Sequence, residues 1–126
     1  MDRLSTLLAH FGVSAGTFHS GSFCGATGFD GNQACGHLHL LQAGELSLRL
    51  ADGRDLQLDK PTLIFCPRPY RHQLLATDTS DTQLVCASLT FDGGAGNALA
   101  AALPDYLVID LDAVPSLAGT LEWLFN

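Results

Sequence analysis

Basic side chains are scarce in this chain. Its 126 residues include six Lys and Arg against 13 Asp and Glu, which gives a net charge of −7. Tight nucleic-acid binding normally needs a basic face that neutralises phosphate groups. We therefore do not expect this stretch of protein to bind DNA or RNA tightly by itself.

Long apolar runs are also missing. No segment approaches the roughly 20 residues that a bilayer-spanning helix needs, and the N-terminus lacks the pattern of a signal peptide. We therefore expect a cytoplasmic protein without a membrane segment. In that compartment the four cysteines are expected to be reduced, and they form no Cys-x-x-Cys pair of the kind found in zinc fingers.

Glutamate, a good helix former, occurs only twice, whereas Asp occurs 11 times and Gly 13 times. Asp and Gly favour turns over helix interiors. In residues 45–51 leucines alternate with polar residues, as in a half-buried strand, and Asp52-Gly53 then predicts a hairpin. The length suggests one domain. Short strands separated by turns predict a barrel or jelly roll.

The sequence also predicts where the single elements lie. We expect segments 72–77 and 82–91 to pair with each other and residues 25–36 to form a loop. The expected strands are 17–24, 37–42, 45–51, 56–58, 62–66, 72–77, 82–91 and 106–109.

Three short helices are expected around these strands, at residues 2–11, at 97–103 and from 113 onward. The last helix reaches Asn126 without a stop signal, which predicts that the chain is cut from a longer protein. We therefore expect one domain over 1–112 and the start of a linker or dimerisation helix over 113–126. The apolar stripe around Trp123 fits either a dimer interface or packing on the barrel.

Histidine spacing is the most informative motif. Gly31 is followed after five residues by His37-Leu38-His39, and residues two apart in a strand share a face. Later, Pro61 is followed after five residues by Pro67, Pro69 and His72, spaced as in the second half of the cupin motif, with Pro61 and Pro69 at the positions of its two glycines. Residues 31–72 thus resemble a cupin, which implies a mainly β fold, a double-stranded β-helix (jelly-roll barrel) with short flanking helices. Glu45 lies one residue too late for the motif's metal-binding glutamate, and one residue of slip in a strand reverses its face.

A narrower resemblance covers nearly the whole chain. The segments HLHLLQAGELSLRLADGRDLQL, TLIFCPRPYRHQL and QLVCASLTF, with GSFCG before them and AALPDYLVIDL after them, are similar to the N-terminal cupin of AraC/XylS-family transcription regulators. This resemblance implies a domain that senses a small molecule, a metal or an oxidant and that often forms homodimers. DNA would be bound only by a separate C-terminal domain, which this chain does not contain.

Five residues could converge inside such a barrel. Imidazole and thiolate ligands together suit zinc, so we expect a metal site drawn from this group, with a closed set made by four of them (all but His37). The alternative is that each histidine is an ordinary buried polar residue and each cysteine a small apolar one. The five candidates are Cys24, His37, His39, His72 and Cys86.

The same residues support a redox hypothesis. A thiolate beside imidazolium or a metal reacts faster with oxidants, so oxidation of Cys24 or Cys86 could change the barrel. Arg68 and Arg71 are candidates for binding an anionic effector near the barrel mouth, with a solvated loop as the alternative. His19 is interpreted as a surface residue.

An enzyme is the competing interpretation, namely a small metal-dependent cupin such as a dioxygenase or isomerase. It would need an open metal position and a general base. Because Glu45 is out of register and no other carboxylate lies near the histidines in sequence, we expect a regulatory domain and not an enzyme.

Overall fold

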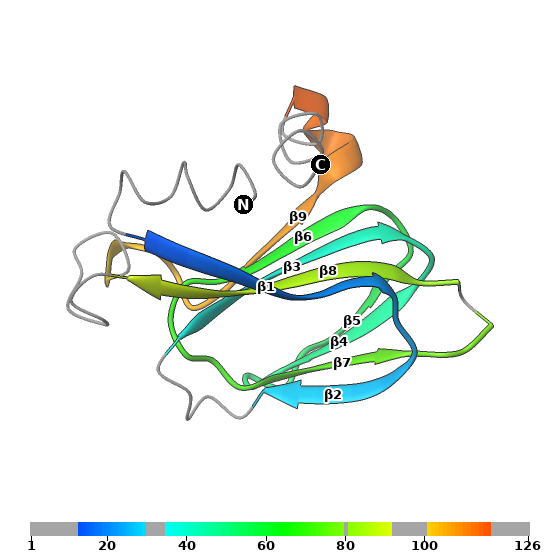
Figure 1. The fold of residues 1–126 in the computed structure, drawn as a ribbon, viewed down its shortest axis with the longest axis horizontal. Coiled ribbons are helices and arrows are strands. Elements are labelled where there is room, and N and C mark those ends of the chain that lie inside the picture. Colours follow the sequence, from blue (N-terminus) through cyan, green and yellow to red (C-terminus); the bar gives the residue numbers. More distant parts are fainter. Residues whose placement is uncertain (1–12, 30–34, 80, 92–100, 117–126) are drawn as a thin grey trace.

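The computed structural model describes residues 13–29, 35–79, 81–91 and 101–116. Two antiparallel sheets face each other in two layers (Figure 1). The first sheet has five strands, in the order β1 (Val13–Ser22), β8 (Gln83–Phe91), β3 (Gly36–Ala43), β6 (Thr62–Cys66) and β9 (Leu107–Asp110). The second has four strands, in the order β2 (Gly25–Phe29), β7 (His72–Ala76), β4 (Leu46–Leu50) and β5 (Asp55–Leu58).

Strand β4 shows how the sequence pattern makes a layer. Its three leucines are buried, while Arg49 between them is exposed, as expected where alternate side chains point to opposite faces. The turn after it closes the predicted hairpin, since β4 pairs with β5 and Gly53 has a φ of +93°. That φ value favours glycine because it has no Cβ. The alternation therefore turns one face of this sheet toward the other sheet.

The five-stranded sheet is apolar on both faces. Leu41, Ile64 and Leu84 point between the sheets and belong to the central core. Leu38 and Val85 belong to a second buried cluster on the opposite face. Strand β3 is consequently buried over six consecutive residues, whose sequence is Gly-His-Leu-His-Leu-Leu.

Two expectations about strands were wrong. The predicted loop over 25–36 contains β2, a strand whose glycines carry no side chains to reveal a pattern. The segments 72–77 and 82–91 do not pair, because β7 lies between β2 and β4 whereas β8 lies between β1 and β3. The connection between them crosses from one sheet to the other, and such crossings produce the jelly roll. The predicted mainly β jelly-roll fold is thus confirmed.

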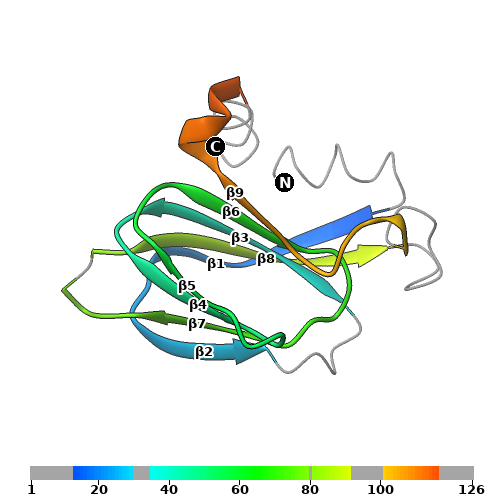
Figure 2. The same ribbon diagram turned by 180° about the vertical axis from the view of Figure 1, so that it is seen from behind.

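The C-terminal part of the described chain turns away from the sheets (Figure 2). After β9 comes a short 3₁₀ helix, η2 (Leu111–Ala113), whose N-terminal backbone is capped by the side chain of Asp110. The helix predicted at 2–11 and most of those predicted at 97–103 and 113–126 lie outside the described residues. Within the described residues, no helix is long and apolar enough to cross a membrane.

Candidate functional site

Two of the predicted site residues lie on β3 and point into the space between the sheets. His37 and His39 are both buried, with 4% and 0% of their surface exposed. Their rings lie parallel, with centroids 5.9 Å apart. The prediction that both imidazoles share one face is confirmed, and that face is the inner one.

The third histidine comes from the opposite sheet. His72 is the first residue of β7, and its Nε2 lies 2.9 Å from the Nε2 of His39. Its Nδ1 lies 2.7 Å from the carbonyl oxygen of Tyr70. Two sequence segments 33 residues apart thus meet inside the sandwich through a direct contact between imidazoles.

The Tyr70 carbonyl fixes the protons in this contact. A carbonyl only accepts hydrogen bonds, so Nδ1 of His72 must donate and, in the neutral ring, its Nε2 carries a lone pair. His39 must then donate from its own Nε2, which leaves its Nδ1 without a proton. That Nδ1 is buried and has no hydrogen-bond partner in the described part of the chain, and the same is true of Nδ1 of His37.

Phe29 completes the cluster of the three histidines, which we call the histidine cluster (His37, His39 and His72). Its ring stacks on His72, with centroids 4.7 Å apart and planes 13° apart. It also lies 4.6 Å from His37 and 5.1 Å from His39. No sequence pattern pointed to this residue, because Phe29 lies in the segment interpreted as a loop.

Burial keeps the histidine cluster neutral. Desolvation, and next the charge of His72, lower the pKa of His37 to about 4. The pKa of His39 is lowered well below its ordinary value, again by burial first. Burial also lowers the pKa of His72, although the hydrogen bond to Tyr70 opposes it. A neutral imidazole is the form that binds a metal.

Cys86 borders the histidine cluster. It pairs directly with His39 across β3 and β8, so the two side chains share the inner face. Burial raises the pKa of its thiol to about 12, so this side chain is a neutral thiol unless a metal binds it. Cys66, interpreted as a small apolar residue, is buried in the core and its thiol pKa is raised to about 12 in the same way.

Cys24 is not brought to the other four candidates. It is exposed, between β1 and β2. Phe29, which pairs with His72, is five residues further along, about 16 Å in an extended strand. The structure therefore does not assemble the predicted four-ligand set, and among the described residues no group of three or more His, Cys, Asp or Glu is placed to hold a metal ion.

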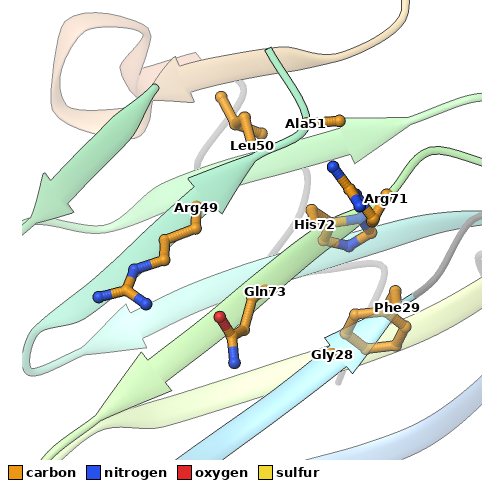
Figure 3. A pocket seen from close by; sticks show the side chains of 8 residues that line it. All are labelled: Gly28, Phe29, Arg49, Leu50, Ala51, Arg71, His72 and Gln73. Carbon is orange, nitrogen blue, oxygen red and sulfur yellow. The ribbon is translucent and has the colours of Figure 1, made fainter. Parts of the chain in front are cut away.

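The two candidate arginines differ. Arg68 donates to the carbonyl oxygen of Leu103 at 2.6 Å and pairs with Asp105 at 2.9 Å, so it holds a loop in place. Arg71 is exposed and stands beside His72 at the rim of an open pocket of about 540 Å³ (Figure 3). Arg49 lines the same pocket. Of the two, Arg71 is thus the better placed to contact an effector near the histidine cluster, and the prediction for Arg68 stays a prediction.

Two further side chains, Glu45 and His19, can be compared with the sequence analysis. The position of Glu45 agrees with it and that of His19 does not. Glu45 is exposed, as its register suggested, so it brings no carboxylate to the cluster. His19, interpreted as a surface residue, has a buried Nε2 without a described partner. Its inward position could not be predicted from the alternation of residues, because the pairing of β1 with β8 shifts between Thr17 and His19.

Two facing antiparallel sheets, with a His-x-His pair meeting a histidine from the opposite sheet, define the class of small jelly-roll domains. The chain belongs to the cupin family, since a family model described as Cupin matches residues 2–126. A comparison with curated protein sequences gave no match.

A solved structure of another protein shows the same fold. Apo ToxT K231A from Vibrio cholerae strain SCE256 matches with a TM-score of 0.55 and 8% identity, over 88% of this chain and 47% of the ToxT chain. Protein NMB1881 from Neisseria meningitidis matches with a TM-score of 0.39 and 14% identity, over 62% of this chain and 72% of its own. The chain thus spans about half the length of ToxT, and the likeness to ToxT shows a shared fold.

Proposed function

We propose that this chain is the effector-sensing domain of an AraC-type transcription regulator and that the histidine cluster is its sensing centre. ToxT, whose fold it shares, is an AraC-family regulator, and its additional length leaves room for a separate DNA-binding domain. The observation that carries the proposal is the 2.9 Å contact between Nε2 of His39 and Nε2 of His72. This contact joins the two sheets, so a ligand that changes it also changes how the sheets sit against each other.

Zinc is the ion we propose, with His39 and His72 as its first two ligands, although a third ligand has to move into place because the described residues hold no ready group of three. At the tetrahedral angle, two Zn–N bonds of about 2.0–2.1 Å put their nitrogens roughly 3.3–3.4 Å apart, so the 2.9 Å contact would widen slightly on binding. The hydrogen bond from Nδ1 of His72 to Tyr70 is the arrangement that orients metal-binding histidines. His37 and Cys86 lie nearest to supply further donors, and the orphaned Nδ1 of His37 shows that this ring still has bonding capacity inside the protein.

When bound, zinc would supply a strong link between β3 and β7. The side chains around it would have three separate roles. His39 and His72 would hold the ion, Tyr70 would keep the ring of His72 in position, and Phe29 would exclude water from one side. Loss or exchange of the ion would then loosen the contact between the sheets, and this is the proposed signal.

Metal analysis of the purified chain tests the site. We expect about one equivalent of bound zinc in the natural chain, and loss of at least nine-tenths of it in His39→Ala and in His72→Ala. Gln73→Ala is the matched control, because Gln73 neighbours His72 but points to the opposite face of β7, and it should keep its zinc. Zinc content that is unchanged in both histidine variants would contradict the site.

The regulator assignment has a test of its own. The coding sequence beyond Asn126 should continue for about 100 residues or more, with helix-turn-helix patterns and a basic net charge. A reading frame without such a domain would overturn the regulator proposal and leave the metal site to be judged by zinc content alone.

The two cysteines of the oxidant hypothesis, Cys24 and Cys86, differ in exposure. Cys24 is exposed, whereas Cys86 is a buried neutral thiol. We propose that an oxidant would reach Cys24 first and Cys86 only after the sheets separate. In the full regulator, Cys24→Ser should then abolish a response to oxidants, and an unchanged response would show that oxidants are not the signal.

A further inference from the structure

A second pocket opens where the edges of the two sheets meet. Strand β1 ends the order of the five-stranded sheet and β2 ends that of the four-stranded sheet, and both edges lie on the same side of the sandwich (Figure 1). A pocket of about 190 Å³ lies between them. We call it the edge pocket, and of its lining residues Phe29 alone also lines the open pocket beside Arg71.

An irregularity in β1 shapes the edge pocket. The pairing with β8 passes from Thr17 opposite Ala87 to His19 opposite Cys86, so Phe18 is the extra residue of a β-bulge. A bulge re-aims side chains and often occurs beside functional sites. As a result two consecutive residues, Phe18 and His19, both line the pocket.

The walls of the edge pocket are aromatic. Phe18, Phe23 and Phe29 line it together with Leu74 and Cys86, and the Phe18 and Phe29 rings are 6.1 Å apart. Phe18 is 52% exposed, so part of its ring is accessible to an apolar occupant. Such a lining accepts an apolar, planar molecule.

One residue that lines the edge pocket, His19, carries an unsatisfied polar atom. Its Nε2 is buried and has no hydrogen-bond partner among the described residues, and a turn of the imidazole toward the pocket would bring this atom to an occupant. A buried polar atom without a partner is destabilising, and a ligand that bonds to it removes that cost. The pocket therefore favours an occupant that has a hydrogen-bonding group as well as an apolar ring.

Size and charge restrict the occupant further. A dry cavity of about 150 Å³ holds benzene, so about 190 Å³ leaves room for one ring and one small substituent. A chain with a net charge of −7 disfavours an anion. We propose that the edge pocket binds a neutral monocyclic aromatic molecule that carries one hydroxyl group, which bonds to Nε2 of His19.

This inference deepens the proposed sensing function and rests on it for its biological role, but not for its test. Phe29 forms a wall of the edge pocket and also stacks on His72. An occupant of the pocket therefore touches a side chain of the histidine cluster. In this arrangement the aromatic molecule and the ion would act on the same contact between the sheets.

Titration calorimetry with phenol tests whether the pocket binds such a molecule. The natural chain, freed of metal with a chelator, should bind phenol saturably with one molecule per chain. Thr27→Trp should weaken binding at least tenfold, because Thr27 lines the edge pocket and the larger ring fills it. Ala26→Trp is the matched control on the opposite face of the same strand, and it should bind like the natural chain.

Toluene tests the hydrogen bond. The natural chain should prefer phenol to toluene by about 2- to 12-fold, the effect of one net hydrogen bond, and His19→Leu should abolish that preference while it still binds toluene. The inference is overturned if phenol does not saturate, if Thr27→Trp binds as tightly as Ala26→Trp, or if the preference survives in His19→Leu. Because no metal is present, such a failure leaves the zinc measurements, and hence the proposed function, untouched.

Discussion

Phe29 contacts both the edge pocket and the histidine cluster. It lines the pocket, and its ring stacks on His72. Its side chain is only 7% exposed although it ends an edge strand. Phe18 also lines the pocket and lies against His37, with ring centroids 6.1 Å apart, and Cys86 lines the pocket opposite His39. Phe29 is therefore one of three side chains that connect the edge pocket with the histidine cluster.

Truncation of this ring should be costly. We expect Phe29→Ala to lower the free energy of unfolding by about 3 kcal/mol, as is usual for removal of a buried phenylalanine. Urea unfolding followed by tryptophan fluorescence or circular dichroism would measure it. Phe18→Ala is the control, since Phe18 is half exposed and its truncation should cost about 1 kcal/mol or less. Equal losses in the two variants would argue against the ring's place in the core.

The cysteines should differ sharply in reactivity. Cys24 is exposed, whereas burial keeps Cys66 and Cys86 as neutral thiols with pKa values of about 12. Since the thiolate is the reactive form, a thiol reagent at neutral pH should modify Cys24 at least about 100-fold faster than the two buried thiols. Mass spectrometry of timed digests would measure the rates. Rapid labelling of Cys86 in the folded chain would refute this placement.

At the scale of elements, three of the connections between the sheets meet at one end of the sandwich. Thr82, which directly precedes β8, ties these three together. Its carbonyl accepts a hydrogen bond from the backbone of Phe23 at 3.0 Å, and its hydroxyl donates to the carbonyl of Glu45 at 2.5 Å. The crossings from β1 to β2, from β3 to β4 and from β7 to β8 thus share one residue.

Removal of the Thr82 hydroxyl tests this arrangement. Thr82→Val keeps the shape of the side chain but leaves the Glu45 carbonyl without its donor, so we expect a loss of about 1–2 kcal/mol in the free energy of unfolding. Thr82→Ser retains the hydroxyl and should lose less. Chemical denaturation compares the variants, and a valine variant as stable as the natural chain would show that the hydrogen bond contributes nothing.

At the scale of the whole molecule, the histidine cluster makes stability depend on pH. The pKa of His37 falls from 6.5 to about 4 on folding, so below pH 6.5 the unfolded chain binds the proton first and the folded state loses stability. Between about pH 7.5 and about pH 5 this amounts to about 2 kcal/mol for His37 alone. We expect the midpoint of thermal unfolding of the metal-free chain to fall over this range.

His37→Leu is the control for the pH effect. It removes one buried imidazole, so its unfolding midpoint should fall less between the same two pH values. A natural chain that is equally stable at both, or a leucine variant with the same pH dependence, would contradict the neutral state of His37.

The sequence predicted the strands wherever alternation was visible, and it predicted the meeting of His39 with His72 through the spacing of two motif halves. It missed β2, because Gly25 and Gly28 carry no side chains. The roles of Phe29 and His19 could not be foreseen, since they depend on which strands lie side by side and on a bulge. The predicted pair of 72–77 with 82–91 failed because neighbours in sequence were assigned to one sheet.

The crossings between the sheets have a mechanical consequence. They hold the two layers at both ends of the sandwich, because the segment from β6 to β7 also passes from one sheet to the other and ends at His72. Any displacement of His72 therefore pulls on residues 67–71 and, through them, on β6 in the opposite layer. A ligand that moves this imidazole would thus act on both layers through the backbone as well as through the contact with His39.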